Sequence, residues 1–128
     1  FYHRHNDFWK AQAFKRLTPL VGSTNMLVCG EDLGMIPDSV PDVMNKLQIL
    51  SLEIERMPKS PQSEFTDMHN LPYHSVCTTS THDMSPLRNW WKEDREKIQR
   101  YYNNVLHCEG HRRLLPVLWQ IIWRQTPC

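Results

Sequence analysis

The sequence is poor in the features that define several broad classes of protein. Its formal net charge is only +1, with 15 Lys and Arg residues against 14 Asp and Glu residues, so it lacks the basic stripe of a dedicated nucleic-acid binder. No apolar run approaches the roughly 18 residues of a membrane span. The four cysteines include no CxxC pair, which argues against a zinc ribbon or a disulfide framework. Reduced thiols are the simplest interpretation, and we expect a cytoplasmic protein without nucleic-acid or membrane partners.

The composition is that of an ordinary globular protein, with 40% hydrophobic and 23% charged residues. The chain of 128 residues can bury one core, but a complete eight-stranded α/β barrel needs about 250 residues. It also begins at Phe1 and not at methionine. These observations predict a piece of a longer protein, and the sequence indicates no oligomeric state.

Helix-like and strand-like segments alternate along the chain. Trp9, Ala13 and Leu17 recur at i, i+4 and i+8, which predicts an amphipathic helix over residues 5–17 that Thr18-Pro19 closes. A proline-containing stretch without periodicity predicts a long loop over residues 57–73. The resulting order α-β-α-β-loop-β-α-α fits an α/β fold with a parallel sheet and right-handed crossovers. The other expected elements are strands at 25–30, 49–56 and 75–79, and helices at 39–47, after Ser85-Pro86 and at 94–106.

Two acidic runs each follow a strand-like segment. Glu31 and Asp32 lie in VCGEDLG, and Asp83 lies in TTSTHDM. Carboxylates at the carboxyl ends of parallel strands are typical of catalytic groups in α/β barrels, and carboxylate pairs perform chemistry on sugar bonds. The local sequence alone leaves open that these acids are only turn and helix-capping residues, because Asp and Glu favour helix starts. Asp32 is predicted to be structural.

Three segments together resemble a known family. They are NMLVCGEDLGMIPDSVP (residues 25–41), LEIERMP (52–58) and STHDMSPLRNWWKED (80–94). They are similar to the 4-alpha-glucanotransferase family, the amylomaltases or disproportionating enzymes, and more so to its larger, maltose-using branch. The resemblance implies part of an elaborated (β/α)8 TIM-type barrel, with about three βα units in this chain. We therefore expect residues 1–109 to form a partial catalytic barrel that acts on maltose, maltooligosaccharides or branched glucan without a cofactor.

The resemblance also implies roles for individual residues. By position, Glu31 matches the family's general acid/base, Asp83 its transition-state-stabilising aspartate, and His82 the neighbouring histidine that contacts the sugar. The family's nucleophile is an aspartate in an Arg-x-Asp motif on an earlier strand. Asp7, the only upstream candidate, lies in an expected helix and lacks that pattern. The 128 residues alone are thus predicted to have no transferase activity.

Two positions depart from the family pattern. Met84 stands where the small amylomaltases have asparagine, so contacts to the acceptor sugar are expected to differ. The segment 110–128 is expected to be a divergent tail, because its apolar density rises abruptly from residue 112. A shifted or prematurely ended reading frame would explain this tail, and sequencing the encoding DNA would test that explanation.

Other functions remain open from the sequence. One is a non-catalytic remnant that binds glucan or packs against a partner, which the absence of an upstream Arg-x-Asp strand motif from the full gene would favour. Another is a metal-dependent hydrolase that uses His3, His5 and Asp7, although on a helix the two histidines point to different faces. The run HCEGH at 107–111 could place two histidines on one helix face, but Gly110 interrupts that helix. No metal site is therefore predicted.

Overall fold

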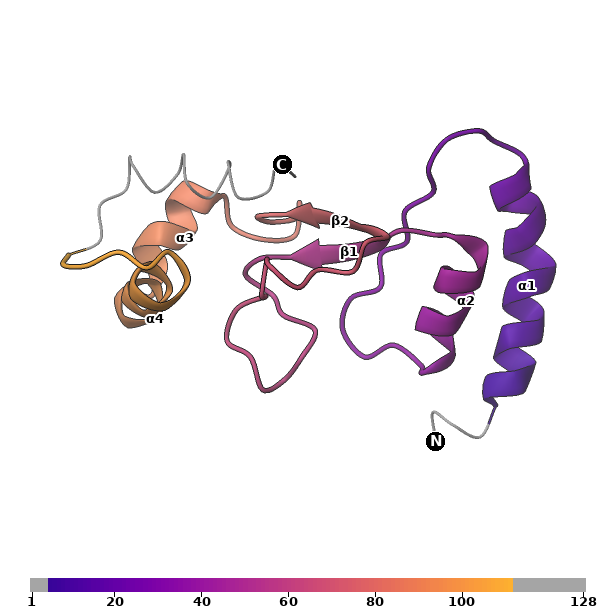
Figure 1. Ribbon diagram of the computed structural model, residues 1–128, viewed down its shortest axis with the longest axis horizontal. Helices are drawn as coiled ribbons and strands as arrows, with labels where there is room; N and C mark the ends of the chain where they lie inside the picture. The colour runs from indigo at the N-terminus through magenta and orange to yellow at the C-terminus, as the bar shows by residue number, and fades with distance from the viewer. Residues whose placement is uncertain (1–4, 112–128) are drawn as a thin grey trace. The chain divides into compact units, whose positions relative to one another are not determined.

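The computed structural model describes residues 5–111 of the 128-residue chain (Figure 1). These residues form a mixed α/β structure with two strands, which confirms the α/β class. They divide into two compact units, each described here by itself: unit 1 contains residues 5–52 and 71–76, and unit 2 contains residues 53–70 and 77–111. Two strands do not by themselves amount to about three βα units of a barrel.

Helix α1 (Asn6–Gly22) begins unit 1 and confirms the first predicted helix. The prediction that Thr18-Pro19 closes it is wrong, because Pro19 lies inside the helix. A proline inside a helix removes one hydrogen-bond donor and crowds the carbonyl four residues earlier, which can kink a helix without ending it. The helix ends after Gly22. There the backbone N and the Oγ of Ser23 both donate to the carbonyl of Leu20, at 3.2 and 2.7 Å.

Helix α2 (Ser39–Leu47) has the predicted bounds, and Val43 and Met44 are buried in it. It ends where Gln48 adopts a left-handed conformation with φ of 54°. The N–H of Gln48 donates to Asn45 at 3.2 Å and that of Ile49 to Met44 at 2.9 Å, which is the paired bonding of a Schellman motif. This tight ending explains why a strand follows the helix directly.

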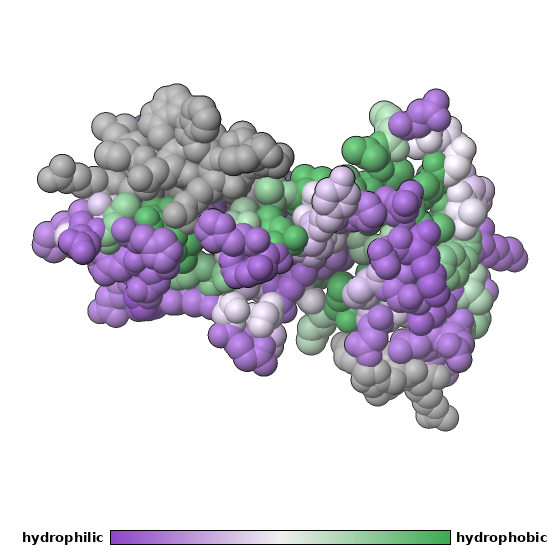
Figure 2. All heavy atoms as spheres, viewed as in Figure 1, coloured by the Kyte–Doolittle hydropathy of each residue, from purple (hydrophilic) through white to green (hydrophobic). Residues whose placement is uncertain are grey.

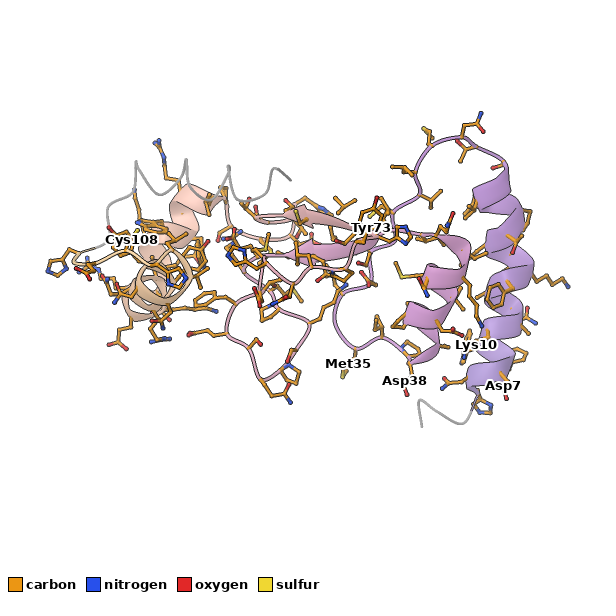
Figure 3. All side chains as sticks on the ribbon, viewed as in Figure 1. Asp7, Lys10, Met35, Asp38, Tyr73 and Cys108 are labelled. Carbon is orange, nitrogen blue, oxygen red and sulfur yellow. The ribbon has the colours of Figure 1, made fainter. Side chains whose placement is uncertain are left out.

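The two helices of unit 1 pack side by side (Figure 1). Lys10 of α1 reaches toward α2, as Figure 3 shows, and its Nζ lies 2.8 Å from Oδ2 of Asp42. The predicted apolar stripe of α1 faces a groove of about 170 Å³ that Val40, Val43 and Met44 of α2 also line. No residue of α1 is buried among the described residues, however. Figure 2 accordingly shows hydrophobic residues on the visible surface of this part of the chain.

Strands β1 (Ser51–Ile54) and β2 (Ser75–Thr78) form a two-stranded sheet. Ser51 N donates to His74 O and Glu55 N donates to Thr78 O, both at 3.0 Å. The partners advance in the same direction along both segments, so the strands are parallel. The predicted strand at 25–30 is reduced to a single parallel bridge between Cys29 and Leu50. The residues of 57–73 contain no helix or strand, which confirms the predicted loop.

Three helical segments complete the described part of unit 2: α3 (Leu87–Glu93), α4 (Arg95–Arg100) and the π-helical turn η1 (Tyr101–Val105). The predicted helices after Ser85-Pro86 and at 94–106 are confirmed by them. Asp94 separates α3 from α4 in an extended conformation, and its side chain accepts a hydrogen bond from Lys97 N at 2.9 Å. It is a typical N-cap.

The core of unit 2 is an aromatic cluster around Tyr101, which is fully buried together with Ile98. The rings of Trp90 and Phe65 meet Tyr101 edge to face, with centroids at 5.2 and 5.0 Å. Such pairs add to the stabilisation that burial alone provides. The buried members of the cluster are Trp90, Trp91, Ile98, Tyr101, Tyr102 and Leu106.

An ion pair on unit 2 provides a test at acidic pH. Arg100 donates from Nε and Nη2 to the two oxygens of Glu64, at 3.0 and 2.6 Å. This hydrogen bonding lowers the pKa of Glu64 below its ordinary value of 4.5. The pair therefore stabilises the fold above pH 4.5, and its contribution is lost as the pH falls through the lowered pKa of the folded state.

We expect Glu64→Gln to lower the melting temperature of the complete gene product slightly at neutral pH, because surface ion pairs contribute little. The difference from wild type should shrink as the pH falls through the lowered pKa. Differential scanning fluorimetry across pH would measure it, with the exposed Glu109→Gln as control. A difference that stays constant with pH would contradict this origin of the stability.

Some expectations lie outside the described residues. These are the divergent tail over 112–128 and the part of the metal string that His3 supplies. Within residues 5–111, no helix is long and apolar enough to cross a membrane.

Candidate active site

The loop that carries Glu31 starts at Gly30, whose backbone lies close to the side chains of Met44 and Ile49 in unit 1. Gly30 N donates to Leu50 O at 2.8 Å. A Cβ added to Gly30 would lie 3.0 Å from Cε of Met44 and 3.3 Å from Cγ2 of Ile49. Only a residue without a side chain fits there unless these neighbours move. The glycine thus sets the position from which the next residue, Glu31, projects.

The two acids of this loop have opposite environments. Asp32 is buried, and its Oδ1 accepts a hydrogen bond from Leu52 N at 2.9 Å. Glu31 is exposed. The structural role predicted for Asp32 is confirmed, since it ties the loop to the start of β1. Glu31 is left available for chemistry.

The second predicted pair follows β2 in unit 2. His82 and Asp83 occupy a turn in which Met84 N donates to Thr81 O at 3.2 Å. Their side chains are 82% and 73% exposed, and His82 Nε2 lies 3.2 Å from Asp83 Oδ1. The structure therefore brings these two predicted residues together in a solvent-facing turn.

Glu31 and Asp83 belong to different units. Their convergence on one substrate, predicted from the parallel strands, stays a prediction.

The support of the His82-Asp83 turn was missed by sequence reasoning. Arg56 is buried, and it donates from Nε to Thr79 O at 2.8 Å and from Nη2 to Ser85 O at 2.7 Å. Its guanidinium carbon lies 5.0 Å from the ring centroid of Trp90. Arg56 thus holds both ends of the turn.

Alternation of Glu53 and Glu55 with the apolar residues of the expected strand 49–56 predicts one polar side, but both glutamates are buried. Glu53 bonds Lys59 at 2.6 Å, and Glu55 accepts a hydrogen bond from the hydroxyl of Tyr101. Charged groups need such partners when they leave water.

The structure gives no support to the metal alternatives where it describes them. Asp7 is an exposed residue of α1 (Figure 3). His107 lies after η1 with φ of 52°, and Gly110 has φ of 81°, so residues 107–111 form no helix face. Among residues 5–111 no group of three or more His, Cys, Asp or Glu side chains is placed to hold a metal ion.

Comparison with known proteins adds to this geometry. The sequence model of the 4-alpha-glucanotransferase family matches residues 1–126. The chain is 42% identical over 106 residues to the 4-alpha-glucanotransferase DPE2 of Oryza sativa subsp. japonica, covering 83% of this chain and 11% of that protein. It is 30% identical over 114 residues to the 4-alpha-glucanotransferase of Chlamydia trachomatis, covering 82% of this chain and 22% of that protein. No solved structure matches the chain.

These matches confirm the family resemblance found in the three sequence segments. The chain spans only a small part of the length of these relatives, 11% and 22% for the two proteins above. The family match also runs through most of the segment 110–128. The divergence of that segment stays a prediction.

Proposed function

Because this chain belongs to the 4-alpha-glucanotransferase family, we propose that the protein containing it transfers α-1,4-glucan segments. The donors are maltose or maltooligosaccharides, the acceptors are glucans, and the mechanism is retaining and proceeds in two steps. The observation that carries this proposal is the placement of Glu31 and of His82-Asp83 in the loops that follow paired, parallel segments.

The same placement supports the proposal that the chain supplies about three βα units of a (β/α)8 barrel. The bridge at Cys29, strand β1 and strand β2 pair in parallel; helix α2 lies between the bridge and β1, a loop joins β1 to β2, and helices follow β2. Catalytic groups of such barrels lie at the carboxyl ends of the strands. Both acidic runs follow a parallel-paired segment of this chain, which supports the proposal. From the cysteine spacing, we place the protein in the cytoplasm.

Each proposed site residue has a distinct task. Glu31 protonates the oxygen of the leaving glucan and later takes a proton from the incoming sugar hydroxyl. Asp83 remains ionised and accepts hydrogen bonds from ring hydroxyls, which strengthen as positive charge develops on the sugar. His82 donates a further hydrogen bond to the sugar. The exposure of all three side chains leaves them accessible to a glucan.

The nucleophile of the retaining mechanism is proposed to lie outside these 128 residues. A retaining enzyme holds nucleophile and acid/base only about 5 to 5.5 Å apart. No Arg-x-Asp motif precedes Glu31 in this sequence, and Asp7 lies on helix α1. The 128 residues alone are therefore proposed to be inactive.

Glucose release from maltose tests the proposed function. The complete gene product is expected to release glucose and to form longer maltooligosaccharides, and the 128-residue chain alone is expected to do neither. Chromatography of the products would separate transfer from simple hydrolysis. An inactive complete product that still binds maltooligosaccharide would instead identify a non-catalytic glucan-binding protein.

A further inference from the structure

We propose that Arg56 is a positioning residue that fixes the turn carrying Asp83 for transition-state stabilisation, an inference that rests on the proposed function. It follows from one contact pattern within unit 2. The guanidinium bridges Thr79 O and Ser85 O, the carbonyls on either side of the turn. The resemblance to the family assigns no role to this residue.

The bridge from Arg56 joins the two ends of a turn that is otherwise held locally. His82 and Asp83 are exposed. Among residues 5–111, Met84 N donates to Thr81 O at 3.2 Å and Thr78 Oγ1 donates to Ser80 O at 3.0 Å. Neither joins the two ends of the turn. Arg56 does so through a single rigid side-chain group.

Arginine is suited to this task and lysine is not. Its planar guanidinium presents several N–H donors in a fixed fork, whereas the ammonium of lysine is a point charge on a flexible stem. The two bonds here come from different nitrogens, Nε at 2.8 Å and Nη2 at 2.7 Å. A lysine at position 56 can approach one carbonyl but cannot reproduce this divergent pair.

The surroundings of Arg56 hold the side chain itself in place. Its guanidinium lies over the ring of Trp90, which is buried in the aromatic core. Cation–π contact strengthens when both groups are shielded from water. The preceding residue is fixed as well, since Thr66 N donates to Glu55 O at 3.0 Å and the Glu55 carboxylate binds the Tyr101 hydroxyl.

Burial of Arg56 costs free energy, because its charged guanidinium loses hydration that it would keep at the surface. Loss of water lowers the pKa of Arg56 from its ordinary value, while the nearby carboxylates of Glu93 and Glu55 oppose that effect. Arginine nevertheless stays protonated in proteins. The guanidinium of Arg56 therefore stays charged where it bonds the turn, although its desolvation costs free energy.

The link to the reaction is geometric. A carboxylate that stabilises a developing charge must be held within about 0.5 Å of its productive position. Displacement of a reacting group by about 1 Å can cost a factor of about 100 in rate. Loosening the two ends of the turn would let Asp83 move by such amounts without removing it from the site.

Arg56→Lys in the complete gene product tests the proposal. We expect kcat for transfer from maltose to fall by about 10- to 100-fold, with KM changed by less than about threefold. Arg100→Lys is the matched control, because Arg100 also makes a two-pronged contact in unit 2 but binds the Glu64 side chain and not the turn. The control is expected to keep wild-type kcat.

A double-mutant cycle separates positioning from general structural support. If Arg56 acts through Asp83, adding Arg56→Lys to Asp83→Asn should cost almost nothing beyond Asp83→Asn alone. If the fold-reductions in kcat of the two single variants multiply in the double variant, the proposal is overturned. A wild-type kcat in Arg56→Lys would also overturn it.

Folding is checked on the same samples by near-ultraviolet circular dichroism, with Arg56→Gln as a second variant. Failure of both variants to fold would also overturn the proposal, since Arg56 would then hold the unit and not the turn. An inactive wild-type enzyme would point instead to failure of the proposed function.

Discussion

Glu31→Gln is expected to slow transfer from maltose by about 100- to 10,000-fold, the range that general acid–base groups contribute. The amide has nearly the same shape but cannot protonate a leaving glucan. With α-glucosyl fluoride as donor the first step should survive, because fluoride leaves without a proton. A burst of fluoride equal to the enzyme concentration, followed by slow turnover, would be the diagnostic result.

Asp83→Asn provides the comparison for this prediction. It removes the charge that stabilises the sugar cation, so both maltose and α-glucosyl fluoride should react several orders of magnitude more slowly, with no burst. Both variants should be assayed in the complete gene product at equal folded concentration. Full activity in either variant would remove that residue from the mechanism, and a missing burst in Glu31→Gln would argue against its role as the acid.

Ile98→Ala is expected to lower the free energy of unfolding of unit 2 by about 2–5 kcal/mol. Ile98 is fully buried in the aromatic cluster. Its truncation both loses burial of apolar atoms and leaves a cavity, because the surrounding rings can collapse into the space only in part. Urea denaturation followed by tryptophan fluorescence would measure the change, since Trp90 and Trp91 lie in the same core.

Leu20→Ala is the control for this core substitution. It removes the same number of carbon atoms from a side chain that is 57% exposed, and leucine and alanine both favour helices. Its effect should stay within about 0.5 kcal/mol. Equal destabilisation by the two substitutions would contradict the assignment of Ile98 to the core.

Local patterns in the sequence predicted the elements that local interactions determine. Helix α2 has the predicted bounds because its buried residues Ser39 and Val43 lie four positions apart, with Met44 beside them, and because hydrogen bonds among neighbouring residues end the helix. The end of α1 was misjudged at Pro19, since the lost donor and the crowded carbonyl of a proline can kink a helix without ending it. The strand expected at 25–30 shortened to one bridge because pairing depends on partners elsewhere in the chain.

In the candidate site, too, the sequence predicted local features and not those that depend on distant partners. Short motifs predicted Glu31, His82 and Asp83 as site residues, and these roles stay predictions; a structural role was predicted for Asp32, but its burial was not. The support from Arg56 could not be predicted, because its bonds reach carbonyls 23 and 29 residues away. The contact between Glu55 and Tyr101 spans 46 residues. Alternation in a single strand cannot show which polar side chains have distant partners.

Trp90 takes part both in the aromatic core and in the contact with Arg56. Most cores accept exchanges among hydrophobic residues of similar volume, but this position must also offer the face of a ring to a cation. Its range of acceptable replacements is therefore set by two requirements at once. A substitution of Trp90 during evolution would therefore change the packing of the core of unit 2 and the contact that holds Arg56 at the same time.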